Sequence, residues 1–234
     1  GIVRQILVKD GDRVTEGQPM VILDDIDTRS ELGIINALLD EAMAKMARLE
    51  SERDGSRTIV FPAELLARKD DPAVAKLMLG QEKLHAARTS TIRGKVDQLS
   101  EQAGQIGEQV QGIDAQIKSK EQQIKLIGEE LVGLLDLKSK GLVAMSRVSA
   151  MQREQARLEG ERGELIGQRA SAESKISEVK LQILQVREEM LTQTLTDLRD
   201  TAGRVAELSE RRIASVSRLE RTTIKAPITG DIYQ

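Results

Sequence analysis

The chain has 234 residues, of which 39% are hydrophobic, 31% are charged and only 1%, Phe61 and Tyr233, are aromatic. A single globular domain of this length normally buries several aromatic side chains, so the composition favours long helices over one compact core. The 35 basic and 38 acidic residues give a net charge of −3, which argues against nucleic-acid binding, because that function requires clustered positive charge.

Few residues are available for catalysis. The absence of cysteine excludes thiolate catalysis, disulfides and cysteine-rich zinc sites. His85 is the only histidine, and because it lies among Lys and Arg residues we expect a solvated helix residue. Neither a P-loop nor a GxGxxG motif occurs. The sequence therefore predicts no catalytic, cofactor-binding or metal site, and we do not expect an enzyme.

The first 25 residues have the pattern of short strands and tight turns. Apolar and β-branched residues occupy 2–8 and 19–23, and turns are indicated at Gly11 and Gly17. Tight turns favour glycine because one of their residues often has a positive φ. Two or three such strands are too few to be stable alone, so we expect them to pair with a segment elsewhere in the chain.

Helical sequence follows. Thr28 and Glu31 fit a capping box for a helix over about 28–54, which ends before Gly55. The loop that follows contains at most a short helical turn, and Asp71 before a proline predicts the N-terminus of the next helix.

A heptad pattern then predicts a coiled coil. Apolar residues keep alternating three- and four-residue spacing from Ile92 to Leu134, which predicts a helix over 72–139 with Lys120 as the one polar interruption. A second helix, 147–222 with Ser146 as its cap, has a similar seam. Its polar positions are Gln155, Arg162 and Arg169.

The second seam changes phase near Leu191. It slips there by one residue and is predicted to continue through Leu195, Leu198, Ala202 and Val205. Such a slip indicates a local change in winding or in the partner helix.

The short connection 140–146 makes the two long helices antiparallel neighbours, with arms of roughly 100 and 115 Å. We expect the first helix to lie beside the base of this hairpin. Pairing across the seam places Arg162 near Glu121, and the polar seam residues are expected to fix the register. The predicted fold is mainly α: a long antiparallel coiled-coil hairpin with a third basal helix, inserted in a small split β domain. The predicted domains are 1–25, 26–222 and 223–234.

The two ends of the chain resemble the two halves of a biotinyl/lipoyl domain, the second carrying an IxAPxxGxV-like signature. The residues that carry this lipoyl-like motif are Gly11, Asp12, Val14, Gly17, Ala226, Pro227 and Gly230. Two halves separated by a helical hairpin are similar to the HlyD family of periplasmic adaptors, or membrane fusion proteins. The segments 61–68, 70–75 and 80–81 resemble its protease- and lipase-secretion branch.

The resemblance implies an adaptor that links an inner-membrane ABC exporter to a TolC-like outer-membrane channel in type I protein secretion. It also implies a ring of copies, usually six, through which the secreted protein passes. It implies a periplasmic location, with attachment to the inner membrane. Family members carry a transmembrane helix before the first lipoyl half and a β-barrel domain after the second, so we expect this chain to be a fragment ending before the later lipoyl strands.

The hairpin tip is where the resemblance implies channel contact. Related adaptors carry an Arg-x3-Leu-x6-Ser pattern, and alignment on the turn places Gly133, Leu137 and Ala144 at its positions. Only Leu137 matches, with Ser146 two residues late. Leu142 and Val143 either contact the channel or close the two helices. The predicted contact residues are Leu137, Lys140, Gly141, Leu142, Val143, Ser146 and Arg147.

Three alternatives stay open at this point. A biotin or lipoyl carrier is disfavoured because the helical insertion replaces the hairpin that bears the carrier lysine, and Lys225 lies after that place. A multidrug-efflux adaptor has the same architecture, but the long arms and the Phe61 segment favour protein secretion. A purely structural coiled coil explains the helices and leaves the split β motifs unexplained.

Overall fold

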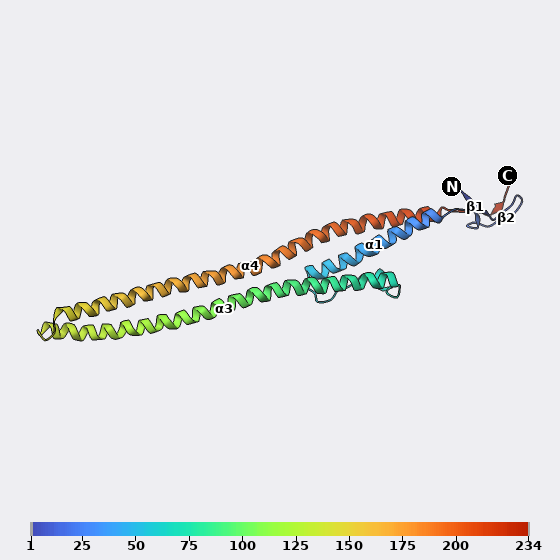
Figure 1. The fold of residues 1–234 in the computed structure, drawn as a ribbon. Coiled ribbons are helices and arrows are strands. Elements are labelled where there is room, and N and C mark those ends of the chain that lie inside the picture. The colour runs from blue at the N-terminus through green and yellow to red at the C-terminus, as the bar shows by residue number, and fades with distance from the viewer. Residues whose placement is uncertain (1, 234) are drawn as a thin grey trace. The chain divides into compact units, whose positions relative to one another are not determined.

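The computed structural model describes residues 2–233, so Gly1 and Gln234, at the ends of the predicted β segments, lie outside the described residues. The predicted fold class is confirmed: two long helices, a third helix at their base and a few short strands (Figure 1). In chain order the elements are β1 (Val3–Ile6), β2 (Arg13–Val14), β3 (Pro19–Leu23), α1 (Ile26–Arg53), α2 (Ala63–Leu66), α3 (Pro72–Ser139), α4 (Met145–Glu220), β4 (Thr223–Lys225) and β5 (Gly230–Asp231).

The chain divides into two compact units. Unit 1 comprises 1–89 and 190–234, and unit 2 comprises 90–189. Unit 1 contains the described strands, α1, α2, the start of α3 and the end of α4. Unit 2 contains the rest of α3 and α4 and their connection. This division cuts both long helices, whereas the domains expected from the sequence keep them whole, so that domain scheme stays a prediction.

In unit 1 the two ends of the chain form a split β module. The strand order β1-β3-β4 is antiparallel throughout, and a second sheet pairs β2 with β5. Val21 lies opposite Ile224, and Val14 lies opposite Gly230. The hydroxyl of Thr229 accepts a hydrogen bond at 3.0 Å from the amide of Glu16, 213 positions earlier. Segments far apart in sequence therefore complete one another, as predicted.

The lipoyl-like motif residues build the turns and pairings of this module. Gly11 and Gly17 have backbone φ values of +86° and +80°, which residues other than glycine rarely adopt. The Gly17 amide donates to the Ala226 carbonyl at 2.9 Å, and the Asp12 carboxylate accepts the Lys9 amide at 2.7 Å. Val14 and Ala226 are buried. Pro227 and Gly230 lie in and just after the turn between β4 and β5.

The helices of unit 1 share one hydrophobic core. Residues of α1, α2, the start of α3 and the end of α4 contribute to it, which is the basal arrangement predicted for the first helix (Figure 1). Phe61 and Leu65 insert from the segment between α1 and α3, and Leu65 is fully buried. The buried members are Leu39, Ala42, Met43, Ala44, Ala47, Phe61, Leu65, Val74 and Leu208.

The capping box predicted for the first helix is wrong. α1 begins at Ile26, two residues before Thr28, and the Asp24 carboxylate accepts the Ile26 amide at 3.1 Å. An acidic residue just ahead offers the free amides an acceptor before Thr28 is reached. Glu31 instead forms an ion pair with Arg218 of α4 at 2.7 Å.

The two hairpin helices begin differently. The predicted cap at Asp71 is confirmed, because its carboxylate accepts the Ala73 amide at 2.8 Å. The cap predicted at Ser146 is wrong, because α4 starts one residue earlier, at Met145, and Ser146 is exposed in its first turn. No helix within residues 2–233 combines the length and hydropathy required to cross a bilayer.

Candidate functional site: the hairpin tip

The backbone of the tip in unit 2 is tightly defined. Gly141 has φ +71°, and its amide donates to the Lys138 carbonyl at 2.9 Å. The Leu142 amide donates to the Leu137 carbonyl at 3.0 Å. These two bonds make a Schellman motif, which satisfies the last carbonyls of α3 and turns the chain toward α4.

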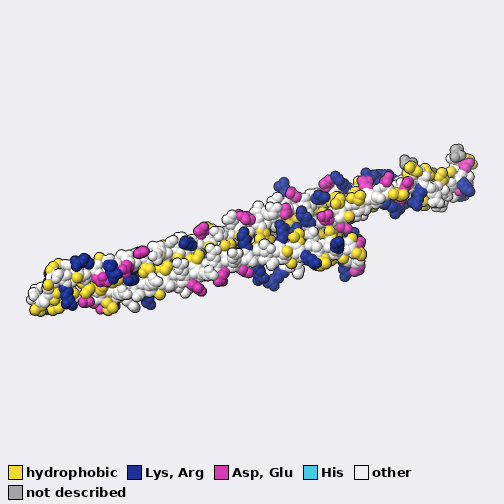
Figure 2. All heavy atoms as spheres, viewed as in Figure 1, with side chains coloured by type: hydrophobic (Ala, Val, Ile, Leu, Met, Phe, Trp, Pro, Cys, Tyr) yellow, Lys and Arg dark blue, Asp and Glu magenta, His cyan; other side chains and the backbone are white. Residues whose placement is uncertain are grey.

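The side chains at the tip divide into a supporting set and an exposed set. A small core of Leu131, Leu134 and Val148 joins the two helices, and Val143 packs against it. Leu142 is 69% exposed. Val143 therefore closes the helices, whereas Leu142 remains available to a partner. Figure 2 shows hydrophobic side chains gathered on this end of the hairpin.

The other predicted tip residues lie within five positions of Leu142 in the sequence. Lys140 pairs with Asp136 at 2.6 Å. Met145 is a further exposed apolar residue, which the sequence analysis did not predict. It comes directly after the turn and does not fit the heptad spacing of the seam, and this mismatch could have indicated an exposed side chain. The remaining predicted residues, Leu137, Gly141, Ser146 and Arg147, are all exposed.

The Gly141→Ala substitution should lower the free energy of unfolding by about 1–2 kcal/mol, because alanine is strained at a positive φ. Gly133→Ala is the matched control. Gly133 lies within α3 with nothing within 4 Å of an added Cβ, so alanine there should stabilise by about 0.5–1 kcal/mol. Urea titrations followed by circular dichroism measure both values. Shifts of the same sign would contradict this account of the tip.

The seam of unit 2 carries the predicted polar residues, and each has a partner. Lys120 pairs with Glu161 at 2.5 Å and Arg162 with Glu121 at 3.0 Å, the latter being the predicted pairing. In two further contacts, Arg169 lies 3.1 Å from Asp114 of α3, and Gln155 donates to Glu159 on its own helix. Because three of these pairs join α3 to α4, they favour one antiparallel register over its slipped alternatives.

The Lys120–Glu161 pair extends into a larger charge network. Arg157 of α4 bonds both Glu154 and Glu161. The hydrogen bond from Arg157 lowers the pKa of Glu154, and the hydrogen bond from Lys120 is the main cause of the lowered pKa of Glu161. Both carboxylates therefore favour the ionised form in the folded hairpin.

A lowered carboxyl pKa contributes stability above the unfolded-state value, near pH 4.3 for glutamate, and loses it as the pH falls through the folded-state value. The melting temperature of the chain should therefore fall on acidification below about pH 4.5. The E154Q/E161Q variant should melt lower at pH 7 and lose less between pH 7 and pH 3. Parallel curves for the two proteins would contradict a role for this network.

The seam slips by one residue near Leu191, as predicted, but two of the residues that continue it differ. Leu195 and Ala202 are exposed, and the buried positions belong to Thr194 and Thr201. The Thr201 hydroxyl donates to the carbonyl of the residue four positions earlier, so the side chain can be buried with its polar group satisfied.

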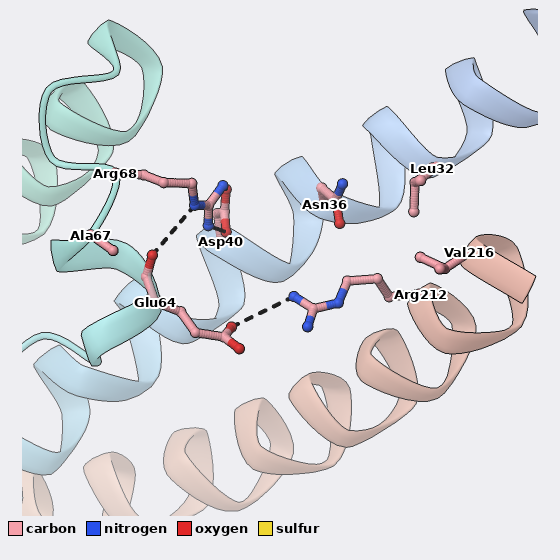
Figure 3. Close-up of a pocket in the computed structure, with 8 residues that line it drawn as sticks. All are labelled: Leu32, Asn36, Asp40, Glu64, Ala67, Arg68, Arg212 and Val216. Atoms are coloured by element: carbon pink, nitrogen blue, oxygen red, sulfur yellow. Dashed lines mark hydrogen bonds and ion pairs between the residues drawn. The ribbon is translucent and has the colours of Figure 1, made fainter. Parts of the chain in front are cut away.

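Unit 1 contains a groove of about 550 Å³ between α1, α2 and α4 (Figure 3). Its charged groups are already paired. Arg68 donates to both carboxylate oxygens of Asp40, which raises the pKa of Arg68, and Arg212 lies 3.6 Å from Glu64. Each charged side chain that lines the groove is therefore paired within unit 1, and the groove offers no unpaired acid or base. The lining residues are Leu32, Asn36, Asp40, Glu64, Ala67, Arg68, Arg212 and Val216.

The expectation that His85 is solvated is wrong. It is only 5% exposed and lies against the end of α1, with Nε2 3.0 Å from the Ser56 carbonyl. The basic residues near His85 in the sequence suggested an exposed helix face. One of them, Arg88, instead forms an ion pair with Glu52, the buried carboxylate that His85 also faces.

Comparisons with known proteins find similar chains among secretion proteins. A family model described as AprE, long alpha-helical hairpin, matches residues 28–218. The type I secretion system membrane fusion protein PrsE of Rhizobium meliloti (strain 1021) is 41% identical over 234 residues, covering 100% of this chain and 53% of that protein. The alkaline protease secretion protein AprE of Pseudomonas aeruginosa is 26% identical over 230 residues, covering 98% and 53%.

A solved structure has the same fold. The soluble domain of LipC, described as a membrane fusion protein of a type I secretion system, superposes with a TM-score of 0.95 at 25% identity. The match covers 99% of this chain and 87% of that one. The chain spans about half the length of the curated relatives it matches.

Proposed function

Because the chain belongs to the AprE family of long α-helical hairpins, we propose that it forms the hairpin part of a type I secretion adaptor. In this role it links an inner-membrane ABC exporter to a TolC-like outer-membrane channel in the periplasm. The role is one of contact and support without catalysis. Attachment to the inner membrane belongs to the whole adaptor.

The observation that carries the proposal is the exposed Leu142 on a tip whose backbone is held by hydrogen bonds. A leucine side chain that is 69% exposed contributes nothing to the hairpin's own core, whereas the Schellman motif and the core beneath it fix its position. An apolar side chain held at a fixed point, with Lys140 and Arg147 beside it, is suited to insertion into an apolar pocket of a protein partner. We assign that pocket to the channel.

The remaining partners follow from the same role. Copies of the adaptor would assemble as a ring, expected to contain six, around the secreted protein in transit. The ion pairs of the polar seam would keep α3 and α4 in register, so that Leu142 stays at the end of the hairpin. The split β module would join the hairpin to the remainder of the adaptor.

The test replaces Leu142 with aspartate in the full-length adaptor, expressed with its exporter and channel. Val132→Asp is the matched control, because Val132 is 71% exposed on α3 away from the turn. We expect L142D to reduce channel copurification and secretion by at least about tenfold, the effect of losing one anchor residue. V132D should retain both. Normal channel recruitment by L142D, with the hairpin folded, would overturn the proposal.

A further inference from the structure

Charge is distributed unevenly along unit 2. In the segment around the turn, 131–153, the charged residues are Asp136, Lys138, Lys140, Arg147 and Arg153, of which only the first is acidic. The rest of unit 2, 90–130 and 154–189, contains 15 acidic and 11 basic residues. The tip is therefore positive, whereas the remainder of the same unit is negative.

Three of the basic residues at the tip have no partner in the hairpin. Lys140 pairs with the one acidic residue, Asp136, at 2.6 Å. Lys138, Arg147 and Arg153, called the tip cations below, have exposed side chains. Within residues 2–233 no carboxylate forms an ion pair with any of them. Their charges are thus free to meet a partner.

Arg147 is placed against the preference of its own helix. It lies in the first turn of α4, which contains no acidic residue. The free amides at a helix N-terminus carry partial positive charge, so this position favours an acidic side chain over a basic one. Lys138, in the last turn of α3, suits its helix. The stability of the hairpin therefore accounts for Lys138 and leaves Arg147 without a role inside it.

The tip cations lie at the same end of unit 2 as the exposed Leu142, where Figure 2 shows basic side chains beside hydrophobic ones. Lys138 comes just before the turn and Arg147 just after it, and Arg153 lies about 12 Å of helix from the start of α4. The Debye length is about 8 Å in physiological salt and longer in dilute salt, so a partner docking on Leu142 meets these charges.

We propose that the tip cations bind carboxylates of the partner that docks on Leu142. The inference rests on the proposed function, in which that partner is the channel, and it specifies the chemistry of the channel surface: Asp or Glu side chains next to an apolar pocket. In such an interface the apolar anchor supplies affinity, and the charges at the rim accelerate encounter and fix orientation. The two arginines are suited to bidentate contact with carboxylates.

An anionic lipid surface is the competing partner. Helices that bind membrane surfaces present an apolar face to the lipid along their length and basic residues on the other face. Near the tip, α3 and α4 instead turn apolar residues toward each other, in the core of Leu131, Leu134 and Val148. Leu142 is exposed at the turn itself. A single apolar anchor with cations beside it favours a protein pocket over a lipid surface.

The test measures the association rate of the full-length adaptor with its purified channel at 50 mM and 500 mM NaCl. For the wild type we expect the rate to fall about tenfold at the higher salt concentration. The K138Q/R147Q/R153Q variant should associate about tenfold more slowly at 50 mM and depend little on salt. Its dissociation rate should change by less than about threefold, because charges at a rim act mainly on association.

The matched control is R93Q/K180Q/R187Q, which removes one lysine and two arginines from exposed positions of unit 2 away from the tip. It should keep the wild-type association rate and salt dependence. Equal behaviour of the two triple variants would overturn the proposal. So would binding of the wild type to phosphatidylglycerol vesicles that competes with the channel and is lost in the tip variant.

Two further variants separate the possible failures. L142D removes the anchor and keeps the tip cations, so loss of channel binding in L142D alone would leave the adaptor role intact and overturn the role of the charges. R147Q should melt no lower than the wild type, because Arg147 opposes its own helix. A lower melting temperature would show that Arg147 serves the hairpin itself and would contradict the proposal.

Discussion

Replacing Glu52 with alanine is expected to lower the free energy of unfolding by about 3–5 kcal/mol, one of the two largest effects of a single substitution in this chain. The carboxylate is fully buried between Arg48 and Arg88, and the Arg48 side chain is only 4% exposed. Alanine would leave that guanidinium buried without a counter-charge, and removing one partner of a buried pair costs more than the pair contributes. Urea unfolding at pH 7 followed by circular dichroism measures the loss.

Glu41→Ala is the matched control for this substitution. Glu41 is a glutamate of the same helix with an exposed side chain, so its replacement should change stability by less than about 0.5 kcal/mol. If the two variants unfold at the same urea concentration, the charged cluster does not hold α1 to α3.

Leu65→Ala should cost about 2–5 kcal/mol, because it removes a fully buried side chain from the core of unit 1. Leu65 lies on the short helix α2, which enters the core between α1, α3 and α4. The surrounding core residues belong to the helices α1, α3 and α4, so they can shift only slightly to fill the cavity that alanine leaves. Thermal melts and hydrogen exchange of the segment 54–71 report the loss.

The neighbouring residue supplies the comparison. Leu66 is 46% exposed, so Leu66→Ala should cost less than about 1 kcal/mol. A similar loss from both substitutions would show that α2 does not insert into the core in the way described.

The helices and their pairing could be predicted because the coiled-coil signal is local and repeats. Every apolar seam position from Ile92 to Leu134 is buried or half-buried, as the period requires. The helix starts were harder to predict. Asp24 and Ser146 show why: a cap depends on which acceptor lies next to the free amides, and several candidates were close in sequence.

Buried polar residues could not be predicted, because their burial depends on partners from other elements. Thr194 and Thr201 take seam positions where neighbouring Leu195 and Ala202 fit the sequence pattern better. His85 is buried because Glu52 and the Ser56 carbonyl, 33 and 29 positions away, meet its ring. The residues next to His85 in the sequence do not indicate these contacts.

At the candidate site the sequence predicted the position of the turn. It could not distinguish the residues that close the two helices from those that are exposed. Leu142 and Val143 are adjacent apolar residues, and from the sequence either one could contact the channel or close the two helices. In the structure Val143 packs against the core formed by Leu131, Leu134 and Val148, whereas Leu142, the last residue of the Schellman motif, is exposed. That outcome depends on backbone geometry.

The most direct measurement places a photo-crosslinking amino acid at position 142 of the full-length adaptor, with position 132 as the comparison, in cells making the exporter and channel. The adaptor role predicts a crosslink to the outer-membrane channel from position 142 and a much weaker one from position 132. Equal crosslinking from the two positions, or capture from position 142 of proteins other than the channel, would contradict it.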